Sequence, residues 1–313
     1  MSNEQLAFVF PGQGSQKVGM LADLASQYPV VQETFAEASE VLGYDLWELI
    51  QSGPQEELNL TERTQPMLLT ASVATWRVWQ QKGGNTPALM AGHSLGEWSA
   101  LVCSGVVAFK DAVKLVQLRG KYMQQAVPAG VGAMAAIIGL DDEAINAACA
   151  EAAGDEVVAA VNFNSPGQVV IAGHAGAVER AIEACKSAGA KRAMPLPVSA
   201  PFHTSLMKPA ADQLADQIEA TSFSAPATPI VHNVNAKTEA DPAKIKALMI
   251  EQVYTPVLWV DCTKALIAGG ATQVVECGPG KVLSGLCRRI DKSLTAFATD
   301  TPADLDKALA ELS

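Results

Sequence analysis

One stretch of the sequence decides the fold: Ala88-Leu89-Met90-Ala91-Gly92-His93-Ser94-Leu95-Gly96-Glu97. An apolar segment, residues 88–91, leads into a G-x-S-x-G pentapeptide, and a helix-like segment follows from Glu97. A serine between two glycines at a strand-to-helix turn is typical of a nucleophile elbow, which holds the hydroxyl exposed on a tight bend. The same residues also suit a plain turn, so the motif alone leaves both interpretations open. Its position between a strand and a helix favours a catalytic Ser94.

The segments on either side of the elbow predict a parallel sheet. Residues 6–10 form a short apolar strand that ends at Pro11, and helical stretches separate it from the elbow strand. After residue 203 the pattern continues with a helix, a strand at 230–234, a helix at 242–252 and a strand at 273–277. Strands that alternate with helices are typical of α/β proteins. We therefore expect an α/β fold whose large domain is α/β-hydrolase-like with a parallel sheet.

A different pattern interrupts this domain. Strands are expected at residues 133–139, 157–162, 168–172 and 192–198, with helices at 143–153 and 175–188 and a turn at 165–167. This βαββαβ order is that of a ferredoxin-like split unit. We therefore expect a catalytic domain made of residues 1–128 and 199–313. The ferredoxin-like insert, residues 129–198, is expected to form one wall of the active-site cleft.

Composition and charge exclude several classes of protein. The 313 residues, 49% of them apolar, suffice for one large core and a smaller second domain. A net charge of -11 argues against a general nucleic-acid binder. No apolar run reaches the roughly 18 residues of a membrane span, and residues 1–5 lack the basic region of a signal peptide, so we expect a cytoplasmic protein that makes no use of a membrane. The six cysteines show no CxxC pairing and mostly fall in apolar segments, which predicts reduced core thiols rather than disulfides or a metal site.

A general base for Ser94 has few candidates, because the chain contains only four histidines. His93 lies inside the elbow, His174 is expected in a turn of the insert, and His232 is expected within a strand. His203 is the best candidate, since it is expected to open a helix whose positive end would keep the imidazole neutral. A polar residue at a helix start with no catalytic role is the alternative. No aspartate stands out as the acid that would orient this histidine, so a dyad with another orienting group stays open.

Arg119 is the residue that a purely structural interpretation explains worst. It lies on the apolar face of the helix that begins near Asp111, seven residues after Ala112. A guanidinium that faces a core needs an anion. That anion is either an internal carboxylate such as Glu97 or the carboxylate of a substrate, which the planar fork would bind through two parallel hydrogen bonds.

Three further motifs are ambiguous. Residues 11–17, PGQGSQK, begin like a dinucleotide fingerprint but carry Lys17 in place of the third glycine, so we prefer a loop that supplies a backbone N–H to an oxyanion hole. Residues 278–281, GPGK, lack the spacing of a P-loop and predict a tight turn. Asn162, Asn164 and Gln168 flank the hairpin of the insert, where they either face a cleft or serve the turn.

These motifs together resemble one family. The residues that carry the resemblance are Phe10-Pro11-Gly12-Gln13-Gly14-Ser15-Gln16, Gly92-His93-Ser94-Leu95-Gly96-Glu97, Arg119, Asn162-Phe163-Asn164-Ser165-Pro166, Pro201-Phe202-His203 and Glu276-Cys277-Gly278-Pro279-Gly280-Lys281. In order and spacing they are similar to the malonyl-CoA:acyl carrier protein transacylases of bacterial type II fatty acid synthesis, over nearly the whole chain. By that resemblance Ser94 is the acyl-accepting nucleophile and His203 its base. The backbone carbonyl of Gln252 would orient His203, the backbone N–H groups of Gln13 and Leu95 would form the oxyanion hole, and Arg119 would bind the malonyl carboxylate.

The resemblance also implies an activity. The expected enzyme is a monomer that moves a malonyl group from malonyl-CoA to the phosphopantetheine thiol of acyl carrier protein by ping-pong kinetics, without a metal or other cofactor. A serine thioesterase or other hydrolase acting on acyl-CoA would share Ser94 and His203 but has no need of Arg119. A non-catalytic acyl-carrier or CoA-binding module would not need Ser94 at all.

Overall fold

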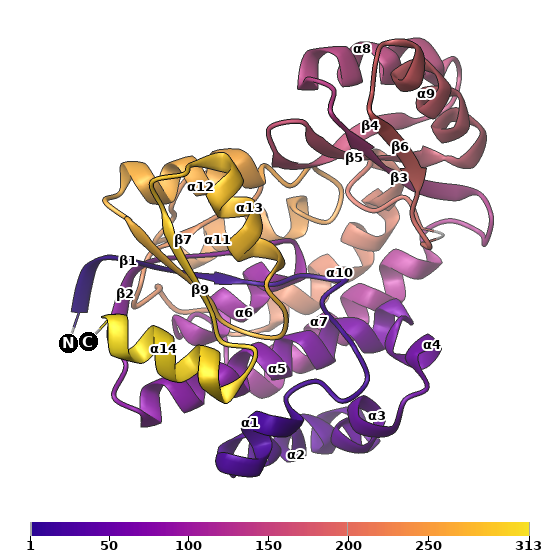
Figure 1. Ribbon diagram of the computed structural model, residues 1–313. Helices are drawn as coiled ribbons and strands as arrows, with labels where there is room; N and C mark the ends of the chain where they lie inside the picture. Colours follow the sequence, from indigo (N-terminus) through magenta and orange to yellow (C-terminus); the bar gives the residue numbers. More distant parts are fainter. Residues whose placement is uncertain (1, 199, 313) are drawn as a thin grey trace.

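Two sheets organise the protein, whose computed structural model describes residues 2–198 and 200–312 (Figure 1). Up to the insert, the elements are β1 (Ser2–Phe10), α1 (Ala22–Gln27), α2 (Val30–Leu42), α3 (Leu46–Ser52), α4 (Gln55–Leu58), α5 (Thr61–Gln81), β2 (Thr86–Gly92), α6 (Leu95–Cys103) and α7 (Phe109–Gln125). After the insert come a 3-10 helix η1 (Ser205–Met207), α10 (Lys208–Ala220), β7 (Ile230–Val231), α11 (Pro242–Glu251), α12 (Trp259–Ala268), β8 (Gln273–Glu276), α13 (Val282–Ile290), β9 (Thr295–Ala298) and α14 (Pro302–Leu312).

The larger sheet is parallel and buried on both faces. Its strand order is β7-β2-β1-β8-β9, and every neighbouring pair runs parallel. Along β1, Leu6, Phe8 and Phe10 enter the core formed with α2, α5, α6 and α7, whereas Ala7 and Val9 enter a second core with α12 and α13. Figure 1 shows these two groups of helices on opposite sides of the strands. Because a sheet covered on both faces needs apolar residues at every position, the continuous apolar run of β1 follows directly.

The insert is a separate antiparallel sheet. Its elements are β3 (Gly132–Ile138), α8 (Asp142–Ala153), β4 (Val158–Ser165), β5 (Gln168–His174), α9 (Ala175–Ser187) and β6 (Arg192–Pro195). The strands pair in the order β4-β5-β3-β6, all antiparallel. The βαββαβ order expected from the sequence is therefore present, and the fold is mixed α/β with a parallel and an antiparallel sheet.

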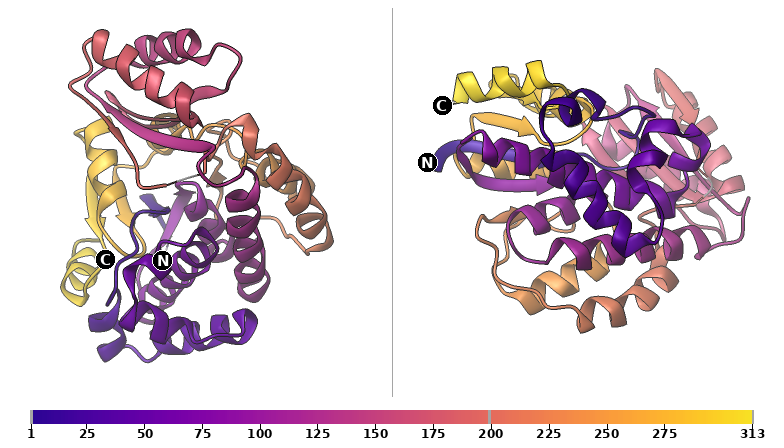
Figure 2. Two further views of the ribbon diagram at one scale, coloured as in Figure 1. Left: turned by 90° about the vertical axis from the view of Figure 1, so that its right-hand side faces the viewer. Right: turned by 90° about the horizontal axis from the view of Figure 1, so that it is seen from below.

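The two faces of the insert sheet have different neighbours. Ala135, Ile137 and Ile171 pack under α8 and α9 in a core of the insert's own, whereas Met134 and Val170 join the core of the large domain. Figure 2 shows α8 and α9 on the side of this sheet that faces away from the large domain. Because side chains alternate along a strand, one face of the insert sheet packs against α8 and α9 and the other packs against the large domain.

Strand β4 also joins the insert to the large domain through its backbone. The N–H of Val257 donates to the carbonyl of Val161 at 2.8 Å, and the N–H of Phe163 donates to the carbonyl of Val257 at 3.1 Å. Val257 lies between α11 and α12, in the segment that follows Gln252. The insert is therefore tied to a segment that borders the site.

Several expected boundaries change. β4 continues to Ser165, so Asn164 belongs to a strand, and β6 ends at Pro195, before the expected residue 198. β7 ends at Val231, which leaves His232 just beyond the strand rather than within it. Edge strand β9 and helix α14 are additions to the expected elements. Five of the six cysteines are buried, as expected for core thiols, and Cys103 is partly exposed.

Candidate active site

The two glycines of the pentapeptide are required by close backbone packing. A Cβ added to Gly92 would lie 2.0 Å from the carbonyl of Gly96, and a Cβ added to Gly96 would lie 2.0 Å from the carbonyl oxygen of Phe10. Such distances are far inside van der Waals contact, so β1, β2 and α6 converge here only without side chains at these positions. The G-x-S-x-G spacing therefore reflects the crossing of α6 over the ends of two strands.

Ser94 has the strained backbone expected of a nucleophile elbow. Its φ is 50° and its ψ is -107°, in a region that residues with a side chain rarely occupy. Its backbone N–H donates to Oδ1 of Asn233 at 2.8 Å, and Nδ2 of Asn233 donates to the carbonyl of Gly92 at 2.7 Å. The serine between β2 and α6 is therefore presented on a bend, and the elbow interpretation fits this geometry better than a plain turn.

His203 lies against Ser94 as the sequence predicted. Its Nε2 is 2.7 Å from Oγ of Ser94, and its Nδ1 is 2.9 Å from the backbone carbonyl of Gln252. The carbonyl of Thr255 is also within reach of Nδ1, at 3.2 Å. Carbonyls only accept, so Nδ1 carries the proton, and Nε2 accepts the hydrogen bond of the Ser94 hydroxyl.

The environment keeps His203 neutral. Burial, with a smaller contribution from the positive charge of Arg119, lowers its pKa to about 3, while the hydrogen bond to the carbonyl of Gln252 opposes this change. The expected neutrality is present, and burial is its largest cause. His203 has φ 62° and lies two residues before η1, which continues directly into α10, so a helical segment through Met207 and Leu214 follows it as expected.

Arg119 reaches the same serine from α7. Its Nη1 donates to Oε1 of Gln65 at 2.9 Å, and its Nη2 donates to Oε1 of Gln252 at 2.9 Å and to Oγ of Ser94 at 3.2 Å. Arg119 is buried, and its Nε–H has no acceptor among the described residues. Burial lowers the pKa of Arg119 to about 10, and the charge of Glu97 opposes the change. Two neutral amides thus hold a charged fork that keeps hydrogen-bonding capacity to spare.

Glu97 is not the direct partner of Arg119. Its Oε1 lies 2.6 Å from Nδ1 of His232, and its Oε2 accepts from the backbone N–H of Asn233 at 3.1 Å and from Nε2 of Gln252 at 2.8 Å. The Gln252 amide therefore stands between the carboxylate and the guanidinium, with its oxygen toward Arg119. Within residues 2–198 and 200–312, Arg119 forms no ion pair with a carboxylate. An internal carboxylate, Glu97, therefore lies near Arg119 but does not bind it directly.

The two expected oxyanion donors lie in the elbow and in the loop after β1. Leu95 is the first residue of α6, where backbone N–H groups have no acceptor inside the helix. Gln13 lies in the loop after β1, which is anchored to the elbow by the N–H of His93 donating to the carbonyl of Phe10 at 3.0 Å. Both residues line the same cavity as Ser94 and His203. Arg119 lines this cavity too, and Gln252 contacts both Arg119 and His203.

This cavity has a volume of about 330 Å³ and lies between the large domain and the insert. The large domain contributes Gln65, Arg119 and Met123, and the insert contributes Met134 and Asn162. Residues from both parts of the chain therefore line the cavity that contains Ser94.

The remaining candidates have structural partners. Nε2 of His93 lies 2.7 Å from Oδ1 of Asn164, and Oε1 of Gln168 accepts from Nη1 of Arg289 at 2.7 Å. His174 is the last residue of β5 instead of lying in a turn, and its Nδ1 accepts from the N–H of Val157 at 2.9 Å. Asn162 and Asn164 line the cavity. Of the hairpin residues, these two face the cleft and Gln168 serves a surface contact.

Four contributors to the site carry no signal that sequence reasoning used. They are the side chains of Gln65, Asn233 and Gln252 and the carbonyl of Thr255. Buried polar side chains that are far apart in the sequence give no spacing pattern, and a backbone carbonyl gives none at all. The one indirect signal was Arg119 itself, because a guanidinium on an apolar helix face needs buried acceptors, and Gln65 is one of them.

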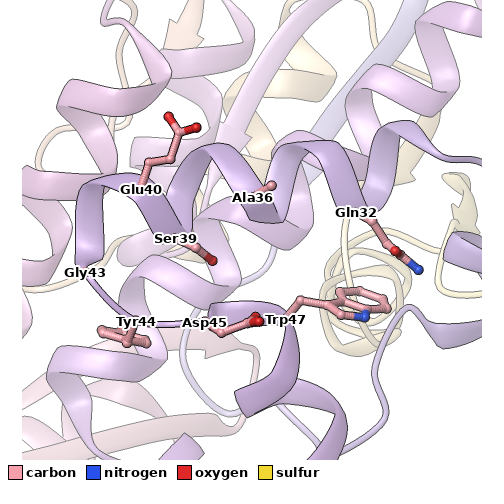
Figure 3. Close-up of a pocket in the computed structure, with 8 residues that line it drawn as sticks. All are labelled: Gln32, Ala36, Ser39, Glu40, Gly43, Tyr44, Asp45 and Trp47. Carbon is pink, nitrogen blue, oxygen red and sulfur yellow. The ribbon is translucent and has the colours of Figure 1, made fainter.

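A larger hollow, about 600 Å³, lies between α2 and α3 (Figure 3). Its carboxylates have other roles, since Glu40 pairs with Lys110 and Asp45 caps the N-terminus of α3. In Figure 3 Glu40 points away from Trp47. The hollow shares no lining residue with the cavity at Ser94, so nothing connects it to the serine.

Two other kinds of feature are absent from the described residues. Within the described residues, no group of three or more His, Cys, Asp or Glu side chains is arranged to hold a metal ion. Nor does that part of the chain contain a helix with the length and hydropathy to cross a bilayer.

Comparison with known proteins agrees with this site. The acyl transferase domain family matches residues 7–299. A malonyl CoA-acyl carrier protein transacylase of Salmonella typhimurium is 63% identical over 307 residues, covering 98% of this chain and 99% of the relative. The Bacillus subtilis protein of the same name is 46% identical over 309 residues, covering 98% and 97%.

Solved structures give the same result. An acyl carrier protein S-malonyltransferase from Vibrio cholerae superposes with a TM-score of 0.95 at 63% identity, over 97% of this chain and 99% of that one. A malonyl-transacylase in complex with a type II polyketide synthase acyl-carrier protein superposes with a TM-score of 0.97 at 59% identity, over 98% and 99%. The elbow, the buried histidine and the arginine thus lie in a chain that belongs to the acyl transferase family and, within it, to the malonyl CoA-acyl carrier protein transacylases.

Proposed function

We propose that this protein transfers the malonyl group of malonyl-CoA to the phosphopantetheine thiol of acyl carrier protein through a malonyl-Ser94 intermediate. One observation carries the proposal: a buried guanidinium, held by neutral amides, lies 3.2 Å from Oγ of a serine that is hydrogen-bonded to a buried histidine. A nucleophile and a carboxylate receptor therefore share one cavity. The names of the relatives support the same substrates.

The first half-reaction begins at the Ser94–His203 dyad. Oγ of Ser94 forms a bond to the thioester carbon while its proton passes to Nε2 of His203, and the C–S bond to CoA then breaks as that proton moves to the sulfur. The carbonyls of Gln252 and Thr255 accept the Nδ1–H of the imidazolium that forms. They take the place of the aspartate of a triad. The N–H groups of Gln13 and Leu95 stabilise the tetrahedral oxyanion.

The second half-reaction reverses these steps with a different thiol. His203 takes the proton of the phosphopantetheine thiol, the sulfur bonds to the malonyl carbon, and the proton returns to Oγ as the ester bond breaks. Because the intermediate outlasts the departure of CoA, the kinetics are ping-pong. No step requires a metal or a further cofactor.

Arg119 selects the acyl group. A malonyl carboxylate placed on the guanidinium gains charge-assisted hydrogen bonds that an acetyl group cannot make. Arg119 lines the cavity, and its guanidinium has five N–H groups but contacts only three acceptors among the described residues, so it keeps donors for a substrate carboxylate. A hydrolase acting on uncharged acyl groups would bury this charge to no purpose, and Arg119 therefore favours the transferase over the thioesterase.

We extend the proposal to the domain organisation. Residues 1–128 with 199–313 form an α/β-hydrolase-like catalytic domain, and residues 129–198 form a ferredoxin-like insert; residues 1, 199 and 313 lie outside the described part of the chain. The parallel order of the large sheet and the βαββαβ order of the insert support these assignments. We also propose that the enzyme works as a monomer in the cytoplasm, where malonyl-CoA and acyl carrier protein occur in bacterial type II fatty acid synthesis.

Intact mass spectrometry tests the proposal. Wild type mixed with malonyl-CoA should gain a malonyl adduct, and Ser94→Ala should gain none. Ser99→Ala, which removes a buried serine of the same helix α6 that has no hydrogen-bond partner among the described residues, should behave as wild type. Added phosphopantetheinylated carrier protein should discharge the adduct and carry the malonyl group itself.

The other outcomes identify the rivals. Free malonate released without carrier protein, at the rate at which malonyl-CoA disappears, would show a hydrolase. Tight binding of malonyl-CoA with neither adduct nor turnover would show a binding module and refute the proposal.

A further inference from the structure

We infer that Asn233 is a positioning residue for the acyl transfer proposed above. Its side-chain amide forms hydrogen bonds with the backbone at both ends of the strained elbow, at Gly92 and at Ser94, and thereby fixes Ser94. The inference rests on the proposed function for its purpose, but its geometry concerns only the nucleophile. Asn233 is fully buried and follows β7 by two residues. It has no contact with the cavity that would make it a substrate ligand.

The topology of the sheet explains why an asparagine lies at this point. β7 runs parallel to β2, with Val231 beside Ala91. Because the carboxyl ends of neighbouring parallel strands share one edge of a sheet, the residue two positions after Val231 comes alongside the bend that begins at Gly92. Asn233 therefore meets the elbow from the side, in the plane of the sheet.

The amide uses both of its ends on the bend. Oδ1 accepts the N–H of Ser94 at 2.8 Å, and Nδ2 donates to the carbonyl of Gly92 at 2.7 Å. A flipped amide would set donor against donor and acceptor against acceptor, so only one orientation satisfies both groups. The backbone of Asn233 is itself held, since its N–H donates to Oε2 of Glu97 at 3.1 Å and its carbonyl accepts from Leu258 at 3.2 Å.

The hydrogen bonds of the Asn233 side chain matter because the backbone of Ser94 is strained. A φ of 50° with a ψ of -107° persists only where the surroundings hold it. The hydrogen bond from Ser94 to Asn233 also turns the Ser94 N–H away from substrate, toward the core. The oxyanion donors are thereby restricted to other N–H groups, those of Gln13 and Leu95.

Asn233→Asp provides a sharp test, because a carboxyl group has the shape of the amide but two states. When protonated, it can still accept from Ser94 and donate its O–H to the carbonyl of Gly92. When ionised, it presents an oxygen to that carbonyl and repels it. The titratable groups around it are Glu97, His232 directly before it, the thiol of Cys262 at 4.0 Å from Nδ2, and His203 beyond Ser94. Burial and a nearby carboxylate both raise the pKa of an introduced carboxyl, so the two states should interchange within an accessible range.

The measurement is the rate at which phenylmethylsulfonyl fluoride labels Ser94, from about pH 5 to about pH 9, where an introduced buried carboxyl should titrate. This neutral reagent needs the nucleophile and its base but neither Arg119 nor a carrier protein. Asn235→Asp is the matched control, since Asn235 is exposed on the same loop and only accepts from the N–H of Lys237. We expect Asn235→Asp to follow wild type throughout. Asn233→Asp should match wild type at the acidic end and fall behind it with rising pH, on the order of 10²-fold, the loss typical of a misplaced reacting group.

Labelling of Asn233→Asp that follows wild type at every pH would overturn the inference, including the case in which only its melting temperature falls. If that variant does not fold, amide hydrogen exchange of wild type decides: the Ser94 N–H should be protected from exchange, and exchange at the rate of an open loop would overturn the inference. Because the label does not require malonyl transfer, a wild type that labels normally but forms no malonyl adduct would refute the proposed function alone.

Discussion

Replacing Arg119 with methionine should convert the enzyme from a malonyl-selective to a malonyl-indifferent one. The side chain is buried, and methionine fills a similar volume without charge. Arg119 lines the cavity, and its five N–H groups exceed by two the three acceptors that they contact among the described residues. Each charge-assisted hydrogen bond contributes about 1.5–3 kcal/mol, so two of them contribute about 3–6 kcal/mol, which corresponds to a loss of about 10²- to 10⁴-fold in kcat/KM for malonyl-CoA.

The assay compares initial rates of acyl-enzyme formation with malonyl-CoA and acetyl-CoA, in wild type, Arg119→Met, Arg119→Lys and Arg77→Met. Arg77→Met is the matched control, because it removes a partly buried arginine of α5 that pairs with Glu37 outside the cavity. The acetyl rate should stay the same or rise in Arg119→Met. Arg119→Lys should be intermediate, since it keeps the charge but loses the planar fork.

A malonyl rate in Arg119→Met within about threefold of wild type, a difference below about 1 kcal/mol, would refute the role of Arg119. So would an equal loss for both donors, since that would show a defect in the nucleophile. Nη2 of Arg119 does donate to Oγ of Ser94, so labelling of Ser94 by phenylmethylsulfonyl fluoride must be measured alongside.

The pKa of His203 predicts two pH profiles, and the packing of the elbow predicts the effect of two glycine substitutions. The free enzyme should show no loss of Ser94 labelling near the ordinary histidine pKa of 6.5, because the pKa of His203 is lowered to about 3 and the base stays neutral; an inflection near 6.5 would contradict this. Between pH 6.5 and about pH 3, His203 binds a proton in the unfolded chain but not in the folded protein, so the free energy of unfolding falls as the pH falls. Urea unfolding of His203→Gln should therefore show a weaker pH dependence than wild type in this range. Gly96→Ala places a Cβ 2.0 Å from the carbonyl oxygen of Phe10 and should lower the free energy of unfolding by more than about 1–3 kcal/mol. Gly285→Ala, in α13 with open space around its Cβ, should instead raise it by about 0.5–1 kcal/mol; equal effects of the two would refute the packing argument.

Local chemistry explains which parts of the site could be predicted. The pentapeptide around Ser94 needs glycine at Gly92 and at Gly96, because a Cβ added at either position would lie 2.0 Å from a backbone atom. This constraint concerns residues that are close in the sequence, so a short motif reveals it. Arg119 was visible because a cation on an apolar helix face contradicts the pattern around it. The order of strands and helices in the insert was likewise local, and the structure reproduces it.

The parts that could not be predicted depend on contacts between distant segments. Gln252 lies 158 residues after Ser94, and its side chain bonds Ser94, Glu97 and Arg119 while its carbonyl accepts from His203. No spacing rule describes a residue that acts through both its backbone and its side chain. Burial is equally invisible in the sequence, which is why desolvation, the largest cause of the lowered pKa of His203, could not be predicted. Strand β9 at the edge of the sheet was also not predicted.

The arrangement of charges would couple the strength of the base to the presence of a malonyl carboxylate. In the free enzyme the charge of Arg119 helps to lower the pKa of His203, which makes the imidazole a weak base. Gln65 and Gln252 hold the guanidinium with neutral oxygens, and Glu97 lies one amide away, so no direct partner cancels that charge. A malonyl carboxylate would be the first direct counter-charge, and by offsetting Arg119 it would raise the pKa of His203 while Ser94 is being attacked. An acetyl group would bring no such change. The same guanidinium would therefore discriminate twice, once in binding the carboxylate and once in the strength of the base that the bound carboxylate restores.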